Sequence, residues 1–255
     1  MQLLKLSETI NFMKLRVPAM ILSTVLILAS LFSLATNSLN WGLDFTGGTL
    51  LEVEYETPVA LDSVSAVLTE AGYRDVTVQN FGSETDVLVR MSEAFRDNLG
   101  NEVLGILQEN TANNQLTLLR SEFVGAQVGE ELRDEGGLAL LLALGIVMIY
   151  VAVRFQFKFS VGAVVALFHD VIIIIGLFAL FQWEFDLTVM AALLAVIGYS
   201  LNDTIVVSDH IRENFRVLRK GDSEEIVNYS INQTLGRTIM TSLTTALVLL
   251  ALMVV

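Results

Sequence analysis

The residues best suited to do chemistry in this chain are Asn202 and Asp203, which interrupt an otherwise apolar segment. Between Leu187 and Val207, about 20 residues and so long enough to cross a bilayer core of roughly 30 Å, Asp203 is the only charged side chain. A charge there costs at least ~2.5–3.5 kcal/mol, so such residues usually face a bundle interior or a water-filled cavity and mark ion pathways. The sequence therefore predicts a proton relay at Asp203, with Asn202 beside it.

A static role for the same segment is the alternative. Ser200, Asn202, Asp203 and Thr204 could join neighbouring helices through hydrogen bonds, as polar side chains do in membranes. Such joints normally use hydroxyl or amide groups, and an ionisable side chain adds a cost that a static contact does not require. This cost favours the relay.

Arg237 is the basic residue that could serve Asp203. Burial favours the protonated form of a carboxyl group, whereas a nearby arginine favours the carboxylate. If Arg237 approaches Asp203 in one conformation and leaves it in another, the carboxyl group releases and takes up a proton in turn. The alternative for Arg237 is an interfacial anchor whose charged end reaches the membrane surface.

A second polar pair, His169 and Asp170, lies near the middle of the third apolar run, about ten residues in at about 1.5 Å per residue. Adjacent helical residues point about 100° apart, so both cannot face one partner. A relay role and a packing role are equally compatible with their positions.

The composition is that of an integral membrane protein. Of 255 residues, 53% are hydrophobic, and they gather in long runs that are not typical of soluble domains. The mean hydropathy is +0.62. The chain has no cysteine and only two, widely separated histidines, so no disulfide framework is available and no metal or redox cofactor is predicted.

Five apolar runs predict membrane-spanning helices. The first covers 17–36, and the segment 138–255 predicts a transmembrane bundle of four helices. Basic residues precede the first run and lie in the loops after the second and fourth, which by the positive-inside rule are cytoplasmic. This rule assigns 1–16 and the loop 210–236 to the cytoplasm. The basic residues before the first run and in these two loops are Lys5, Lys14, Arg16, Arg154, Lys158, Arg212, Arg216, Arg219 and Lys220. We expect a sixth span to be missing, because the chain stops at the end of its fifth.

The segment 37–135 predicts a water-soluble domain outside the cytoplasm, since it holds 18 acidic residues against five arginines and no lysine. Strand patterns cover 49–55, 76–81, 85–91 and 115–125. Apolar residues at helical spacing form two stripes between them: Leu61, Val64, Val67 and Leu68, then Phe95, Leu99, Val103, Leu104 and Leu107. The order β-α-β-β-α-β is that of a ferredoxin-like fold. The predicted fold class is therefore a membrane α-helical bundle with an inserted α+β domain.

The stretch GLDFTGG follows the first span directly. Its glycines Gly42, Gly47 and Gly48 permit close backbone approach or positive φ, so with Asp44 they predict a hinge of the outer domain. The phosphate-binding patterns GxxxxGK[ST] and GxGxxG are absent, so ATP hydrolysis is not expected. We expect Glu184 and Asp186 to be solvated loop charges. The residues Asp209, His210, Arg212 and Glu213 are expected to extend a helix into the cytoplasm.

Four motifs, taken together and in this order, resemble the SecF family of bacterial protein-export membrane proteins. They are NWGLDFTGG at 40–48, FHDVIIIIG at 168–176, GYSLNDTIVVSDHIREN at 198–214 and SINQTLGRTIMTSLTT at 230–245. The resemblance covers nearly the whole chain. Two features depart from the family pattern: the sixth span is absent, and His210 stands where members commonly carry arginine.

The resemblance implies the fold of the resistance-nodulation-division exporters and a non-enzymatic role as accessory subunit of the Sec translocase in the bacterial inner membrane. There the chain would work with SecD, use the proton-motive force and help pull polypeptides across the membrane. It implies functional roles for Asp203 and Arg237 in a proton path shared with SecD. Implied partners are SecD, the SecYEG translocon, translocating polypeptides, protons and the lipid bilayer, with YajC as a further candidate and no nucleic acid.

Two other functions stay open. One is a subunit of a proton-driven small-molecule exporter of the same superfamily, which the modest size of the outer domain disfavours. The other is a static assembly factor that bridges other subunits.

Overall fold

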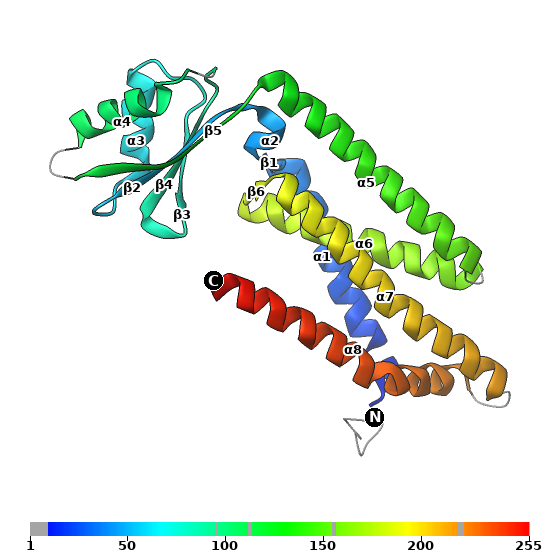
Figure 1. The fold of residues 1–255 in the computed structure, drawn as a ribbon. Coiled ribbons are helices and arrows are strands. Elements are labelled where there is room, and N and C mark those ends of the chain that lie inside the picture. The colour runs from blue at the N-terminus through cyan, green and yellow to red at the C-terminus, as the bar shows by residue number, and fades with distance from the viewer. Residues whose placement is uncertain (1–9, 95, 112–113, 155–156, 219–221, 255) are drawn as a thin grey trace. The chain divides into compact units, whose positions relative to one another are not determined.

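The computed structural model describes residues 10–94, 96–111, 114–154, 157–218 and 222–254, and it combines long helices with two small sheets (Figure 1). Lys5, Phe95, Arg219 and Lys220 lie outside the described residues. The chain forms two compact units. A helical unit contains the residues up to Leu39 with Ala143–Trp183 and Ala191–Val255, and a sheet unit contains Asn40–Leu142 with Glu184–Met190.

Five helices in the described part of the chain are long and apolar enough to cross a membrane, which confirms the predicted number of spans. They are α1 (Arg16–Asn37), α5 (Ala126–Arg154), α6 (Phe157–Phe181), α7 (Leu187–Val217) and α8 (Ser223–Val254), and a short 3-10 helix, η1 (Phe12–Leu15), precedes the first. The helices exceed the apolar runs, because polar turns can continue a helix into water. Consequently the segment 210–236 is mostly helix and not the loop that the charges suggested.

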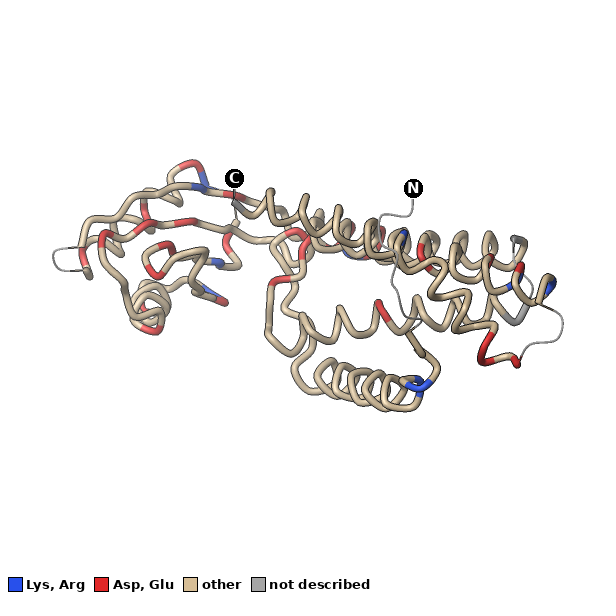
Figure 2. The backbone as a smooth tube through the Cα atoms, turned by 90° about the horizontal axis from the view of Figure 1, so that it is seen from below, with Lys and Arg blue, Asp and Glu red and all other residues tan. Residues whose placement is uncertain are grey.

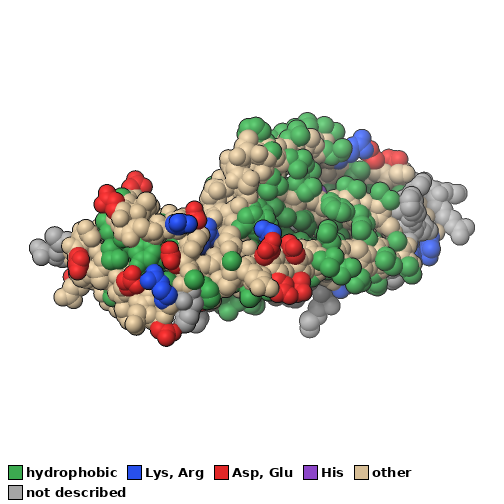
Figure 3. All heavy atoms as spheres, turned by 90° about the horizontal axis from the view of Figure 1, so that it is seen from above, with side chains coloured by type: hydrophobic (Ala, Val, Ile, Leu, Met, Phe, Trp, Pro, Cys, Tyr) green, Lys and Arg blue, Asp and Glu red, His purple; other side chains and the backbone are tan. Residues whose placement is uncertain are grey.

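The long helices present apolar side chains outward. Met20 and Phe32 of α1, Leu141 of α5 and Leu247 of α8 are all more than half exposed. Figure 2 shows few charged residues along much of the length of these helices, and Figure 3 shows hydrophobic side chains over their surface. A helix satisfies its own backbone groups, so such a surface is compatible with lipid.

Helices α1 and α6 pack closely through small residues. Ser30 and Ser33 of α1 are buried, and a Cβ atom on Gly176 of α6 would overlap with Ser30. Without a hydrophobic driving force between helices in lipid, small residues that allow close approach are what such contacts require.

The sheet unit contains a four-stranded antiparallel sheet of order β3-β4-β2-β5. Its strands are β2 (Gly48–Tyr55), β3 (Thr77–Phe81), β4 (Ser83–Met91) and β5 (Leu116–Val124), with α3 (Leu61–Glu70) between the first two and α4 (Leu99–Asn110) between the last two. The elements therefore follow one another in the predicted β-α-β-β-α-β order. Period-2 alternation in β2 and β4 directs one set of side chains to a single face.

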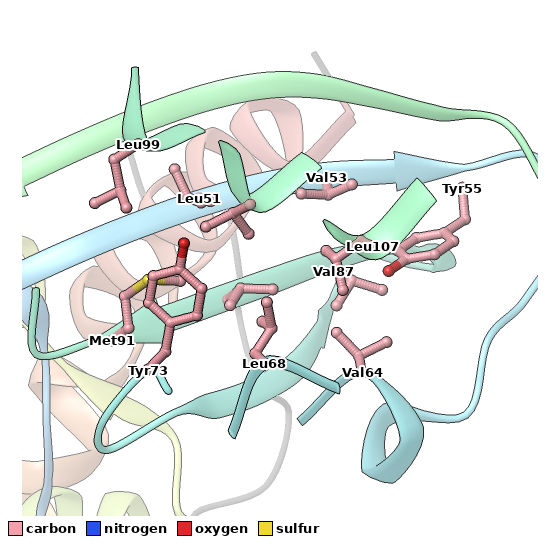
Figure 4. Packing of buried hydrophobic residues seen from close by; sticks show 12 residues of the cluster. Leu51, Val53, Tyr55, Val64, Leu68, Tyr73, Val87, Met91, Leu99 and Leu107 are labelled. Atoms are coloured by element: carbon pink, nitrogen blue, oxygen red, sulfur yellow. The ribbon is translucent and has the colours of Figure 1, made fainter. Parts of the chain in front are cut away.

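The core of this unit lies between that face and the two helices. Leu51, Val53 and Val87 from the strands meet Leu68 of α3 and Leu107 of α4, as Figure 4 shows. Both helices present the apolar stripe that their sequence predicts, so the amphipathic pattern decides which side of each helix is buried.

A second, two-stranded sheet pairs distant parts of the chain. Strands β1 (Asn40–Trp41) and β6 (Glu184–Phe185) run parallel, and the short helix α2 (Leu43–Thr46) follows β1. This small sheet brings the GLDFTGG stretch to the residues that immediately precede α7.

Candidate functional site

Asp203 borders an open cavity of about 750 Å³ formed by α6, α7 and α8. Its apolar lining residues are Ala192, Ala195, Val196, Ala246 and Leu249. Its other lining residues carry oxygen atoms: Asp170, Tyr199, Ser200, Asp203, Thr204, Thr241, Ser242 and Thr245. Asp203 of the helical unit thus lies on a largely apolar cavity beside Asp170 and several hydroxyl groups. Ionisable side chains within a membrane usually face a bundle interior or a cavity.

Helical periodicity explains why α7 contributes so many of these groups. Ser200, Asp203 and Thr204 stand at positions i, i+3 and i+4, which share one face of a helix. On α8, Thr241 and Thr245 are likewise one turn apart. The motif around Asp203 is therefore a single polar stripe.

The carboxyl group of Asp203 is loosely bound in this conformation. Thr241 Oγ1 lies 3.4 Å from Asp203 Oδ1, and Asn202 Nδ2 lies 3.5 Å from the same atom. Both distances are at the long limit for hydrogen bonds. Asn202 itself is exposed and does not line the cavity. Asp203 therefore keeps most of its acceptor capacity for groups that enter the cavity.

Asp170 is a second carboxyl group on the same cavity. Its Oδ2 accepts a hydrogen bond of 2.5 Å from Ser200 Oγ, which ties α6 to the polar stripe of α7. Its Oδ1 lies 2.9 Å from Nδ1 of His169. Only Asp170 of this pair lines the cavity, in accord with the argument that adjacent helical residues face different ways.

Arg237 does not contact Asp203 in this conformation. Its side chain is exposed and forms no ion pair or hydrogen bond with the part of the chain that the structure describes. Its backbone oxygen accepts from Thr241 Oγ1 at 3.1 Å, so Arg237 lies one helical turn before the residue that touches Asp203. The structure does not bring the predicted pair together, but it places both residues beside the same threonine.

The glycines of the GLDFTGG stretch have the conformations that the sequence suggested. Gly47 and Gly48 have φ of 66° and 113°. A Cβ atom on Gly48 would lie 2.5 Å from the backbone oxygen of Met91, and one on Gly42 would lie 2.9 Å from Cβ of Asp186. A side chain at these positions would meet strain or backbone atoms.

The expectation that Glu184 and Asp186 are solvated loop charges was wrong. Glu184 Oε1 lies 3.6 Å from Arg90 Nη1 and accepts from the backbone N–H of Leu43 at 3.3 Å. Asp186 Oδ1 accepts from the N–H of Val189 at 2.7 Å and caps α7. An aspartate directly before a long helical run is an N-cap signal that could have been recognised. The partners of Glu184 are far away in sequence and gave no such signal.

No group of three or more His, Cys, Asp or Glu side chains is placed to hold a metal ion among the described residues. Carboxyl groups in a cavity bordered by hydroxyl groups can bind and release protons.

Comparisons with known proteins agree on one family. Residues 105–255 match the model "Protein export membrane protein SecD/SecF, C-terminal", and residues 32–59 match the "SecD/SecF GG Motif". The chain is 54% identical over 245 residues to protein translocase subunit SecF of Pseudomonas aeruginosa, covering 96% of this chain and 80% of that protein. It is 49% identical over 254 residues to the same subunit of Vibrio alginolyticus, covering 98% and 80%.

Solved structures give the same result. The chain is similar to the crystal structure of SecDF, a translocon-associated membrane protein from Thermus thermophilus, with a TM-score of 0.87 and 36% identity. It is also similar to SecDF in a super-membrane-facing form, with a TM-score of 0.67 and 37% identity. The match covers 98% of this chain in the first case and 96% in the second, but 34% of the longer SecDF chain in both.

Proposed function

Because this chain belongs to the SecD/SecF family of protein-export membrane proteins, we propose that it is an accessory subunit of the Sec translocase that works with SecD. The complex uses the proton-motive force to promote export of polypeptides across the bacterial inner membrane. The single observation that carries the proton-driven part is Asp203, a carboxyl group on a membrane-length helix that lies on an open cavity beside several hydroxyl groups. The sequence contains no ATP-binding pattern that would suggest another energy source.

Asp203 is the proton carrier in this proposal. Its loose contacts with Thr241 and Asn202 leave it free to alternate between a carboxylic acid and a carboxylate. Arg237, one turn from Thr241, stabilises the carboxylate when the helices bring it near, and releases it otherwise. Asn202 serves as a second hydrogen-bond partner. Each proton that crosses supplies ~2.3 kcal/mol per 100 mV of membrane potential.

Asp170 is a second carboxyl group of the relay. It faces the same cavity, and Ser200 connects it to the face of α7 that carries Asp203. In this proposal the two carboxyl groups take up protons from the same cavity. His169 acts through Asp170, since its ring contacts that carboxyl group and does not line the cavity.

The proposed topology places residues 1–16 in the cytoplasm and the segment 37–135 in the periplasm. The strand order β3-β4-β2-β5 with two helices on one face supports a ferredoxin-like fold for that domain. The proposed partners of the whole chain are SecD, the SecYEG translocon and the exported polypeptide, with YajC as a further candidate. The stretch with Gly42, Asp44, Gly47 and Gly48 connects this domain to the membrane helices.

The test is the variant Asp203→Asn in membrane vesicles that contain the complex with SecD. Asn keeps the size and hydrogen bonding of the side chain but cannot titrate. We expect normal assembly with SecD and loss of the extra translocation that an imposed proton gradient produces. Glu213→Gln, on the polar end of the same helix, is the matched control and should behave as the wild type. Full gradient-driven translocation in Asp203→Asn would leave a static assembly factor as the better account.

A further inference from the structure

We propose that Asp44, Glu184 and Arg90 form a clamp that transmits movement between the four-stranded sheet and helix α7. In this view Asp44 and Glu184 are positioning residues for the proton carrier Asp203. The proposal rests on the proposed function and adds to it a physical connection between the carrier helix and the sheet domain.

The first connection is at the beginning of α7. The first backbone N–H groups of a helix have no acceptor within the helix, so other groups must satisfy them. Asp186 accepts from Val189, but the N–H of Leu187 donates to Asp44 Oδ2, at 3.0 Å. A carboxylate at this end of a helix is also favoured by the helix dipole. A residue from a distant part of the chain therefore holds the first turn of the carrier helix.

Glu184 provides the second connection, from the residues just before α7 to the sheet. Its Oε1 lies 3.6 Å from Nη1 of Arg90 on β4, and its Oε2 accepts from Nε2 of Gln79 on β3 at 3.4 Å. The Arg90 and Glu184 side chains are 22% and 26% exposed, so solvent screens this pair less than a surface ion pair. Arg90 Nη1 also donates to the backbone oxygen of Trp41 at 2.5 Å.

Backbone and ring contacts join the segment 40–45 firmly to the residues just before α7. The N–H of Gly42 donates to the oxygen of Phe185 at 2.9 Å, and β1 pairs with β6. The ring of Trp41 contacts the rings of Phe45 and Phe185 edge to face. Gly42 has no room for a Cβ atom against Asp186. A displacement of β3 and β4 would therefore displace the start of α7 as well.

Helix α7 then carries that displacement to the cavity. It continues without interruption from Leu187 to Val217, and Asp203 lies about 24 Å along it at about 1.5 Å per residue. A simple helix cap needs only Asp186. In addition, Asp44 of α2 accepts from the first residue of α7, and Glu184 contacts Arg90 on β4 and Gln79 on β3. Such contacts between separate segments are what a mechanical connection requires.

The experiment compares polypeptide translocation with proton uptake in proteoliposomes that contain the complete complex with SecD. Asp44→Ala removes the acceptor of Leu187, whereas Asp44→Asn keeps a side-chain oxygen. We expect about tenfold less polypeptide per proton in Asp44→Ala, as for loss of a hydrogen bond to a charged group, and near-normal coupling in Asp44→Asn. Glu84→Gln, an exposed position on β4, is the control and should be unchanged.

An unchanged ratio of translocated polypeptide to protons taken up in Asp44→Ala would overturn the clamp. A proportional fall of translocation and proton uptake would also overturn it, because it would indicate only a folding defect. Hydrogen exchange of the Leu187 amide in the same complex gives a readout that does not require activity. It should be about tenfold faster in Asp44→Ala, and unchanged exchange contradicts the contact. If Asp203→Asn proves fully active, the proposed function fails, while exchange at Leu187 still decides whether the clamp exists.

Discussion

In the proposed mechanism Arg237 pairs with Asp203 during the transport cycle. Arg237→Lys keeps a charge but loses the planar fork of donors that fits a carboxylate. We expect about tenfold slower gradient-driven translocation in Arg237→Lys if it pairs with Asp203 during the cycle. The measurement is a double-mutant comparison in which Arg237→Lys is combined with Asp203→Asn. The double variant should be no worse than Asp203→Asn alone.

The outcome differs if Arg237 is only an interfacial anchor. Arg237→Lys would then be nearly normal, since lysine can also extend its charged end to the membrane surface. Defects that multiply in the double variant would likewise show that the two residues do not act as a unit. Arg212→Lys, on the polar end of α7, serves as the control substitution.

Tyr55 gives the sheet domain a pH-dependent stability. It is 1% exposed and its hydroxyl has no hydrogen-bond partner among the described residues. Burial raises the pKa of Tyr55 to about 12, above its ordinary value of 10.0. The folded domain therefore favours the neutral phenol. The contribution of the neutral Tyr55 side chain to the free energy of unfolding is complete below pH 10. It is lost as the pH rises toward about 12, which lowers the free energy of unfolding by about 2–3 kcal/mol.

We predict that Tyr55→Phe removes much of this alkaline loss and is neutral or stabilising near pH 8, because it removes an unsatisfied buried hydroxyl. Urea unfolding of the segment 48–124, which contains the whole core cluster, at pH 8 and pH 11 measures both effects. Tyr73→Phe is the comparison, since the Tyr73 hydroxyl donates to Glu102 at 3.2 Å and its removal should cost stability near pH 8. An alkaline loss in Tyr55→Phe equal to that of the wild type would refute the assignment.

The sequence predicted which side chains lie together on one helix face, but it did not predict contacts between side chains from distant segments. Asp203, Ser200 and Thr204 could be recognised as one stripe because their spacing is helical. The contacts of Asp44 with Leu187 and of Glu184 with Arg90 depend on tertiary structure. Local sequence carries no information on such pairs, so Glu184 was mistaken for a solvated charge.

At the scale of elements, the packing of α1 on α6 depends on Gly176. We predict that Gly176→Ala destabilises the helical unit by about 1–3 kcal/mol, because the added methyl group overlaps with Ser30 and forces the helices apart. Gly162→Ala on the same helix is the matched control, since no atom lies within 4 Å of its added Cβ. It should be neutral or stabilising, since alanine has the higher helix propensity. Equal thermal stability of the two variants in detergent would contradict the packing argument.

The elements themselves were predicted more accurately than their ends. Alternation in 49–55 and short apolar segments at 76–81, 85–91 and 115–125 located the four strands of the larger sheet within about two residues, and apolar runs located five helices. The ends of α5, α7 and α8 were placed too close to the apolar runs. Hydrophobicity records where lipid begins, whereas a helix ends where its backbone finds other partners. The pair β1 and β6 was not predicted, because two-residue strands have no periodicity.

At the scale of the whole molecule, the topology is open to a direct test. The chain has no cysteine, so a cysteine introduced at one position is the only thiol of the chain that can be labelled. We predict that cysteine at Glu84 reacts with a membrane-impermeant reagent added from the periplasmic side, and that cysteine at Lys14 reacts only from the cytoplasmic side. The opposite pattern would invert the topology.

In the proposed mechanism Asp203 takes up and releases a proton as the complex works. The most direct measurement is infrared difference spectroscopy of the complex with SecD in lipid vesicles, recorded when a proton gradient is imposed. We predict a carboxylic-acid carbonyl band that appears in the wild type and is missing in Asp203→Asn, while Glu213→Gln retains it. A difference spectrum of Asp203→Asn that superimposes on that of the wild type in this region would contradict the claim.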